Sequence, residues 1–251
     1  MSPGADDRYT IPGSGGVLRN KVGAQTRADV DRAMNRFAST EWAIMRTEPI
    51  PELLDLDYLR SVHRRLFSPV LEWAGELRRL GDEVKAEGTS FAYARSQFFE
   101  RGLTDVFGQL EREDYLRGLP ADEFASKLAD RWGYLTMTHP FRDGNTRTQS
   151  IYVHQVAERA GHPILWSGMD VETLRDLRLR AAAGREGPLA EYLRAHLGEP
   201  GAEDSPLALS SRELRAATFP NAPGAWAART EELERPRGST PRLGRSWDLE
   251  R

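Results

Sequence analysis

Apolar residues recur every three to five positions along most of this 251-residue chain, which is the spacing of one face of an α-helix. The first such run begins at Asp29 and ends before Glu48. The second, YLRSVHRRLF, begins directly after Asp57, which we expect to cap it. Helical spacing returns in RSQFFERGLTDVFGQLERE, ADEFASKLADRWGYLTMTH, TRTQSIYVHQVAERAG, MDVETLRDLRLRAAAG and EGPLAEYLRAHLG. The pattern predicts an all-α fold.

Three segments break the helical pattern and divide the chain. Residues 1–27 are rich in glycine and turn residues, which indicates an arm with little regular structure. Short apolar and polar pieces flank GDEVKAEGT, which suits a small β-hairpin. Residues 199–251 are dominated by Pro, Gly, Arg and Ser, so we expect a mostly disordered tail with at most one short helix, near residues 207–217. A segment ordered only by a partner would show the same composition. Residues 28–198 form the predicted helical domain.

Composition narrows the classes of function. The chain is 39% hydrophobic and 29% charged, which is ordinary for a soluble globular protein. It has no apolar run long enough for a membrane span, and its first residues lack the basic and apolar regions of a secretory signal. The absence of cysteine excludes disulfides, thiolate ligands and thiol catalysis. A net charge of -3 gives no electrostatic reason to expect nucleic-acid binding. We expect a cytoplasmic protein, with export as an effector left open.

One polar segment, MTHPFRDGNTRTQS, lies between two predicted helices and collects chemically useful groups. Gly144 permits a tight turn, and the amides that follow it can bind an anion at a helix N-terminus. Asn145 and Arg147 add a neutral and a charged donor. Asp143 suits Mg2+ if phosphates supply further ligands, and His139 has the pKa of a general base at neutral pH. Each residue alone fits an ordinary helix–loop–helix, but together they indicate phosphoryl or nucleotidyl transfer.

The same segment resembles the signature of the Fic (filamentation induced by cAMP) family, HxFx(D/E)GNGRxxR. YTIPGSGGVLRNKVG is similar to the N-terminal arm of that family, and LDYLRSVHRRLFSPVLEWAGELRRL to its helix and WAGE segment. GTSFAYARSQF is similar to the flap that follows. The resemblance covers residues 8–198. It implies a Fic-type α-helical bundle with a small β-hairpin flap over the motif loop.

The resemblance also implies a reaction, the transfer of AMP from ATP to a Ser, Thr or Tyr hydroxyl of a target protein. His139 would take the proton of that hydroxyl, Phe141 would anchor the loop, and Asp143 would hold Mg2+. Nucleotide and phosphate binding would fall to Gly144, Asn145, Thr146, Arg147 and the position of Ser150. The flap would align the target backbone through Lys85, Thr89, Ser90 and Phe91.

Two positions depart from the family signature. Thr146 replaces a glycine but keeps its backbone amide, so the anion site is expected to survive. Ser150 replaces the final arginine, which in the family contacts the distal phosphates. Losing one charged hydrogen bond to phosphate costs about 1.5–3 kcal/mol. Arg147 or another nearby arginine could compensate. Three hypotheses therefore stay open: a protein adenylyltransferase, a related enzyme with another phosphate-containing donor, and a scaffold that binds nucleotide or a partner without turnover.

The sequence lacks the inhibitory pattern that regulates many members of the Fic family. Many family members carry an inhibitory helix with the pattern (S/T)xxxE(G/N). Here Glu87 and Glu186 precede glycine, but neither has Ser or Thr four residues earlier. Three alternatives stay open: a separate small antitoxin-like partner, another form of control, or no control. A partner of the antitoxin type would make this protein a bacterial toxin.

The remaining notable side chains are predicted to have structural roles. His63 is expected to pack or to lie at the surface, His154 to pack, and Trp73 and Trp132 to lie in the core. Tyr93, just past the flap, is a candidate for contact with the nucleotide base.

Overall fold

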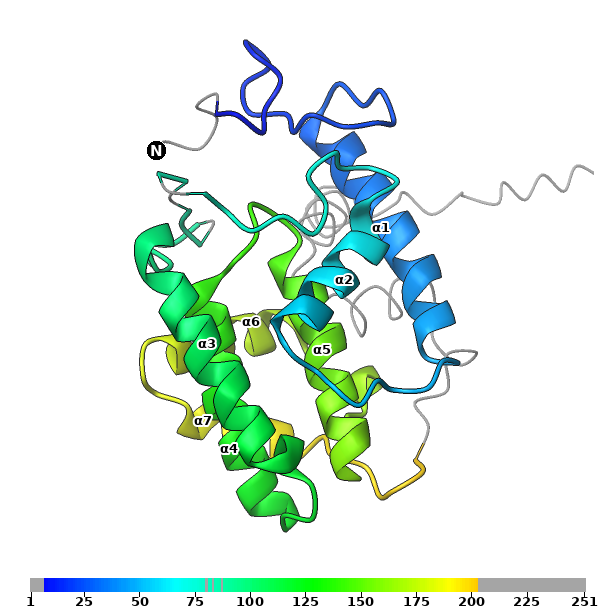
Figure 1. Cartoon of the computed structure of the whole chain (residues 1–251), viewed down its shortest axis with the longest axis vertical. Coiled ribbons are helices and arrows are strands. Elements are labelled where there is room, and N and C mark those ends of the chain that lie inside the picture. The colour runs from blue at the N-terminus through cyan, green and yellow to red at the C-terminus, as the bar shows by residue number, and fades with distance from the viewer. Residues whose placement is uncertain (1–6, 80, 83, 87, 203–251) are drawn as a thin grey trace, which may run out of the picture.

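Seven α-helices build the part of the chain that the computed structural model describes, which is residues 7–202 except 80, 83 and 87 (Figure 1). They are α1 (Arg27–Met45), α2 (Leu56–Phe67), α3 (Ser96–Arg112), α4 (Ala121–Thr138), α5 (Asn145–Ala160), α6 (Val171–Ala182) and α7 (Gly187–Arg194). Two short 3-10 helices, η1 (Asp114–Leu116) and η2 (Trp166–Gly168), follow α3 and α5. The prediction of an all-α fold is confirmed.

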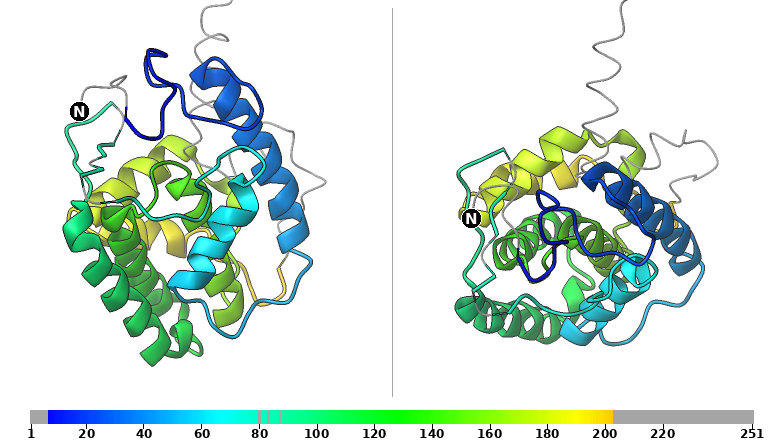
Figure 2. Two further views of the ribbon diagram at one scale, coloured as in Figure 1. Left: turned by 45° about the horizontal axis from the view of Figure 1, so that its top comes forward. Right: turned by 90° about the horizontal axis from the view of Figure 1, so that it is seen from above.

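Helix α4 organises one half of the molecule. It packs against α3, α5, α6 and α7, and its contact with α6 is close because Gly133 faces the backbone of Ala181 (Figure 2). A Cβ atom on Gly133 would lie 2.9 Å from the Ala181 carbonyl carbon. Helices α1 and α2 pack together and form a second core with the N-terminal arm, in which Trp73 is buried. Trp132 and His154 are also buried, as their predicted packing roles require.

Helix α5 lies between the two cores, and this placement explains its sequence. Ile151 packs in the core of α1 and α2, whereas Tyr152, Val153 and Val156 pack in the core of α3 and α4. A helix buried on several sides cannot show a single apolar stripe, so polar residues such as Gln149 are buried as well. The N-terminal end of this buried helix therefore has a fixed position, and the motif loop leads directly into it.

Helix α2 begins two residues earlier than predicted. Asp55, and not Asp57, is the N-cap residue, and its side chain accepts a hydrogen bond of 2.8 Å from the Tyr58 amide. Asp55 has the extended backbone that a cap requires, whereas Asp57 already lies in the first turn, where its charge favours the helix dipole. The prediction that Asp57 caps this helix was wrong by two residues.

The segments outside the helices follow the predictions in part. The arm packs on the domain through Tyr9, Val17 and Leu18, all buried. The predicted hairpin is present as an antiparallel bridge between Lys85 and Ala92. The predicted disordered tail, with its short helix near residues 207–217, lies almost entirely outside the described residues.

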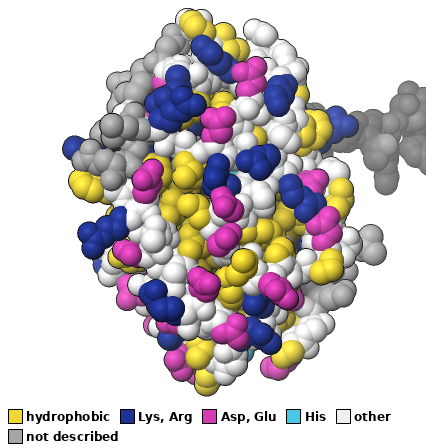
Figure 3. Space-filling view, in the orientation of Figure 1, with side chains coloured by type: hydrophobic (Ala, Val, Ile, Leu, Met, Phe, Trp, Pro, Cys, Tyr) yellow, Lys and Arg dark blue, Asp and Glu magenta, His cyan; other side chains and the backbone are white. Residues whose placement is uncertain are grey.

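The face of the molecule seen in Figure 3 carries charges of both signs. Figure 3 shows acidic and basic side chains interspersed over one side of the molecule, with apolar side chains between them. None of the helices in the described ranges combines the length and apolar character that crossing a membrane requires.

Candidate active site

The motif loop, residues 139–144, joins α4 to α5 through two residues with left-handed backbones. His139 follows the last residue of α4 with φ 44° and ψ 61°, and Gly144 precedes α5 with φ 76°. A left-handed conformation costs a residue with a side chain roughly 1–2 kcal/mol. At Gly144 a side chain is excluded outright, because its Cβ atom would lie 2.4 Å from Cε2 of Phe67. The loop is therefore strained at His139 and closed against α2 at Gly144.

Asn145 closes the loop with its side chain. Its carbonyl oxygen accepts a 2.9 Å bond from the Phe141 amide, and its NH2 group donates a 2.7 Å bond to the Phe141 carbonyl. Phe141 is fully buried and stacks on His63 at 3.9 Å between ring centroids. The Asn145 side chain thus serves mainly to hold the loop. Its backbone N–H and that of Thr146 have no acceptor in the described chain, so both donors are available to an anion at the start of α5.

Asp143 presents one carboxylate oxygen that is already bonded and one that is open. Oδ1 accepts hydrogen bonds from the Gly144 amide and from Arg147, the latter at 3.2 Å, while Oδ2 has no partner within the described ranges. No group of three or more acidic or histidine side chains that could hold a metal is found among the described residues. One open carboxylate oxygen beside an anion-binding helix end fits Mg2+ that takes most of its ligands from phosphates and water.

Arg147 is buried and turned toward α1. Its guanidinium donates a 2.9 Å bond to Asn35, pairs with Asp143, and lies 4.9 Å from the ring centroid of Phe67. In this arrangement Arg147 orients the Asp143 carboxylate. The resemblance to the family assigns it phosphate binding, which would use the donors that are left.

His63 bonds to the backbone of Asp143, a contact that the sequence did not predict. Its Nδ1 accepts a 2.8 Å bond from the Gly75 amide, so Nε2 carries the proton and donates to the Asp143 carbonyl at 2.9 Å. Burial lowers the pKa of His63 to about 4, which keeps the ring neutral and this tautomer in place. The WAGE segment contains Gly75, whose backbone φ is 85°. The predicted packing of His63 is confirmed, and its polar contacts are additional.

Arg78 was not predicted, yet it holds His139 and the flap together. It is buried, and its guanidinium donates to the carbonyl oxygens of Thr138 and His139 at 2.9 and 2.7 Å. It also donates to Asp82 and Ala94, on either side of the flap, at 2.7 Å each. Carbonyls at the end of α4 have no helical partner, so a buried arginine satisfies them and opposes the negative end of the helix dipole.

His139 lies in an environment that keeps its ring neutral. Burial lowers its pKa well below 6.5, and the positive charges of Arg78 and Arg178 lower it further. Nδ1 is buried and has no hydrogen-bond partner among the described residues. The Tyr93 ring stacks on the imidazole with 3.5 Å between centroids and 10° between planes. At neutral pH the imidazole is therefore unprotonated and has a lone pair that can accept a proton, although the same burial makes it a weaker base.

Arg178 reaches this site from α6. It donates to Gln149 at 2.9 Å and to Thr136 at 3.2 Å, and it lies over the Trp132 ring. Burial lowers its pKa to about 10, so it remains a cation at neutral pH. No sequence pattern placed α6 beside the motif.

The two positions that depart from the family signature differ in their surroundings. Thr146 is half-buried in the first turn of α5, where its amide has no partner within the helix. Ser150 is buried one turn further on, and its hydroxyl has no hydrogen-bond partner in the residues that the structure describes. A distal phosphate would therefore meet no α5 arginine at position 150.

One surface cavity lies beside the flap, on the predicted docking side. It has a volume of about 300 Å³, and its lining residues are Thr89, Ser90, Phe91, Asp176, Leu179, Arg180, Ala183 and Arg185. Phe91 contacts Tyr93 edge-on at 5.5 Å, so this cavity is connected to His139 through two aromatic rings. The fourth predicted docking residue, Lys85, does not line this cavity; it forms the antiparallel β-bridge of the flap with Ala92.

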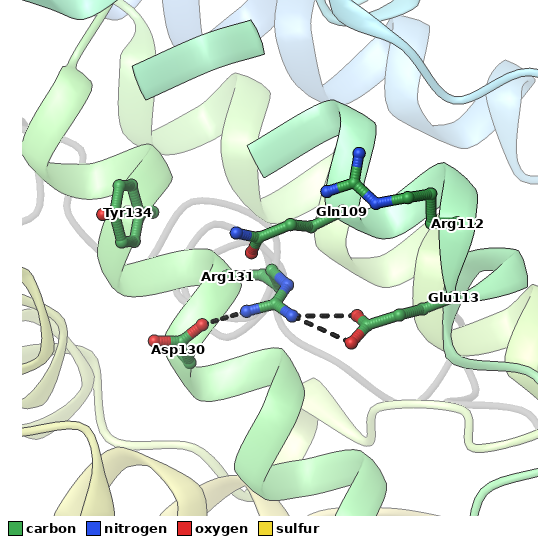
Figure 4. Close-up of a pocket in the computed structure, with 6 residues that line it drawn as sticks. All are labelled: Gln109, Arg112, Glu113, Asp130, Arg131 and Tyr134. Carbon is green, nitrogen blue, oxygen red and sulfur yellow. Dashed lines mark hydrogen bonds and ion pairs between the residues drawn. The ribbon is translucent and has the colours of Figure 1, made fainter. Parts of the chain in front are cut away.

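Another cavity, of about 490 Å³, is a depression between α3 and α4 that contains no motif residue (Figure 4). The residues that line it are Gln109, Arg112, Glu113, Asp130, Arg131 and Tyr134. Figure 4 shows Arg131 between Glu113 and Asp130, paired with both. The acidic side chains that line this depression pair with Arg131, so the depression offers no candidate catalytic group.

Comparisons with known proteins find members of one family. The model of the Fic/DOC family matches residues 53–157. The protein adenylyltransferase VbhT of Bartonella schoenbuchensis is 32% identical over 196 residues, which cover 78% of this chain and 40% of that protein. The probable protein adenylyltransferase y4lH of Sinorhizobium fredii is 30% identical over 193 residues, which cover 75% of this chain and 95% of that protein.

Solved structures show the same fold. The BepC protein of Bartonella tribocorum, a VirB-translocated effector solved with bound AMPPNP, superposes with a TM-score of 0.70 at 25% identity. The match covers 76% of this chain and 96% of BepC. The N-terminal Fic domain of an effector from Bartonella sp. AR 15-3 gives 0.70 at 26% identity and covers 76% and 91%.

Proposed function

The chain belongs to the Fic/DOC family, and from that premise we propose that it is a protein adenylyltransferase, which transfers AMP from ATP to a Ser, Thr or Tyr hydroxyl of a target protein. The observation that carries the proposal is the placement of a neutral, half-buried His139 and of the unpaired amides of Asn145 and Thr146 at the two ends of one short loop. A base and an anion site so arranged suit attack by a hydroxyl on a phosphate. The activity named for the relatives VbhT and y4lH agrees with this chemistry.

The proposed step moves one proton and exchanges one bond at phosphorus. His139 takes the proton of the target hydroxyl as its oxygen bonds to the α-phosphorus of ATP, and the bond from that phosphorus to the bridging oxygen of the β-phosphate breaks. Pyrophosphate leaves, and His139 later releases the proton to water. The amides of Asn145 and Thr146 bind the α-phosphate oxygens, whose negative charge the N-terminus of α5 favours. Asp143 would hold Mg2+, which when bound neutralises phosphate charge.

A second candidate function follows from Ser150. The buried serine offers no charge to the distal phosphates, and Arg147 is engaged with Asn35. These facts favour a donor with fewer phosphates, or nucleotide binding without turnover. The Ser150→Arg variant separates the cases, because faster labelling from ATP would show that the native serine attenuates an ATP reaction.

The test uses nucleoside triphosphates labelled at the α-phosphate, incubated with the purified chain and a cell lysate. We expect ATP to label at least one protein, and His139→Ala to reduce labelling at least about 100-fold. The intact mass of a labelled protein distinguishes added AMP from added phosphate. Absence of label with every nucleotide, or equal labelling by His139→Ala, would exclude the adenylyltransferase.

Location and regulation are part of the proposal. A donor such as ATP requires a nucleotide-rich compartment, so we propose a cytoplasmic site of action, which translocation into another cell also satisfies. We propose that a small bacterial partner supplies an inhibitory helix in trans, because the sequence has no (S/T)xxxE(G/N) segment. Purification of the native chain tests this: a stoichiometric small protein whose removal raises labelling is expected, and full activity of the chain with no bound partner in its own host would contradict it.

A further inference from the structure

Tyr93 covers the face of the proposed base more closely than ordinary packing requires. Its ring centroid lies 3.5 Å from that of His139, with 10° between the planes. The next closest stack of rings in the described chain, His63 on Phe141, has 3.9 Å and 21°. The sequence suggested contact between Tyr93 and a nucleotide base, but one face of this ring is occupied by the imidazole.

The backbone next to Tyr93 fixes the stack. The Ala94 amide donates to the Met137 carbonyl in the last turn of α4 at 2.9 Å. Arg78 then joins the Ala94 carbonyl to that of Thr138, so the end of the flap is bound to the end of α4. Phe91 packs edge-on against Tyr93 from the flap. Contacts of the residues before and after Tyr93 therefore hold its ring in place.

The charges around His139 oppose its protonated form. Arg78 and Arg178 are the charged residues that act on it within the described part of the chain, and both are cations. Arg175, also on α6, acts with Arg178 on Tyr93. Burial raises the pKa of Tyr93, so the phenol is neutral and its ring keeps an ordinary electron-rich face. Such a face attracts a cation placed against it.

We propose that Tyr93 is a positioning residue for the transfer reaction: its ring face fixes the plane of the His139 imidazole and stabilises the imidazolium that forms when His139 takes the acceptor proton. The inference rests on the proposed function. The stabilisation grows as positive charge develops on the imidazole in the transition state, so it acts on the rate of the chemical step and leaves the binding of ATP unchanged.

Two substitutions at one position separate the ring face from the hydroxyl. Tyr93→Leu keeps an apolar side chain over His139 but removes the aromatic face, and we expect the maximal rate of labelling from ATP to fall about 5- to 30-fold. The apparent KM for ATP should stay within about twofold. Tyr93→Phe keeps the face and should label within about twofold of the wild-type rate. Tyr134→Leu, the same change on the exposed side of α4, should have no effect.

A second measurement reports the stack without any activity. The ring-proton resonances of His139 should be displaced upfield in the wild-type chain and in Tyr93→Phe, and should return in Tyr93→Leu, with thermal unfolding used to confirm that each variant folds. Full labelling by Tyr93→Leu, or equal losses in both Tyr93 variants, would overturn the inference. If the wild-type chain labels nothing, the proposed function fails. The inference then fails separately if Tyr93→Leu leaves the His139 resonances unmoved.

Discussion

The motif loop and the depression between α3 and α4 are both rich in polar groups, and they use them in opposite ways. Around the loop, buried side chains bond mainly to backbone: Arg78 to four carbonyls, Asn145 to Phe141, and His63 to Asp143 and Gly75. In the depression, Arg131 and Glu113 form side-chain ion pairs that water reaches.

Buried donors bonded to backbone and exposed ion pairs contribute differently to a site. A backbone-directed bond from a buried donor has no substitute in water, so it can hold a strained residue such as His139 in place. Surface ion pairs are exchangeable and contribute little. The larger cavity is therefore the less informative one, and the strained, dry loop is the candidate site.

The largest effect is expected from Arg78. Arg78→Met removes the donors to four backbone carbonyl groups, and we expect the free energy of unfolding to fall by about 3–5 kcal/mol, with labelling lost in the remaining folded protein. Arg79→Met, at the exposed neighbouring position, should change stability by about 0.5 kcal/mol or less. Urea unfolding of both variants checks the prediction, and similar values for the two would show that the loop does not depend on this arginine.

Gly144 provides a test within one helix. Gly144→Ala places a methyl group against Phe67 and forces a positive φ, so we expect a loss of about 3 kcal/mol and of labelling. Gly161, at the other end of α5, has φ 83° and open space around it, so Gly161→Ala should cost only about 1 kcal/mol and keep activity. Thermal unfolding and labelling measured together separate the two. Equal costs would mean that contact with Phe67 is unimportant.

The pH dependence of stability also separates the two regions. The pKa of His63 falls to about 4 on folding and that of His154 to about 3, both through burial. The unfolded chain binds protons below about 6.5 that the folded chain does not, so stability is complete above that pH and declines as pH falls. Burial acts to raise the pKa of Glu113, but Lys127 and Arg131 lower it overall, so its contribution is lost only below about 4.5.

Between about pH 6.5 and 4.5 the loss should therefore come from the buried histidines, at up to ~1.4 kcal/mol per pH unit for each. Urea titrations at several pH values measure the slope, which should be smaller by one histidine in His63→Gln. The labelling rate should not show a decline centred near pH 6.5 while the chain is folded, because His139 stays neutral. A decline with that midpoint would mean that the base is solvated.

Many features of the fold and of the motif loop could be predicted from the sequence, because they depend on local patterns of residues. The helices, the turn at Gly144 and the grouping of His139 with Asp143 follow from spacing and from residue chemistry within one segment. The Asp55 cap was missed because Asp55 and Asp57 have the same chemistry, and only backbone conformation distinguishes them.

The rest required distances between segments far apart in the chain. Arg78 and His139 are 61 residues apart, and nothing in the spacing of apolar residues indicates that an arginine in GELRRL ends buried against α4. Asn145 was expected to offer its side chain to an anion, and only the folded loop shows both of its amide atoms turned back to Phe141. Tyr93 and Arg178 come together at His139 for the same reason, since tertiary packing and not local pattern decides which helix faces the loop.

The smallest effect is expected in the depression between α3 and α4. Glu113→Gln weakens the pairs with Lys127 and Arg131, whose side chains are 35% and 13% exposed, so we expect a loss of about 1 kcal/mol or less. Glu111→Gln, at an exposed site in the same turn, should change stability by no more than about 0.5 kcal/mol. Labelling should be unchanged in both, because neither residue contacts the motif loop. A clear loss of labelling in Glu113→Gln alone would make the depression part of the active site and would remove the contrast between the two regions.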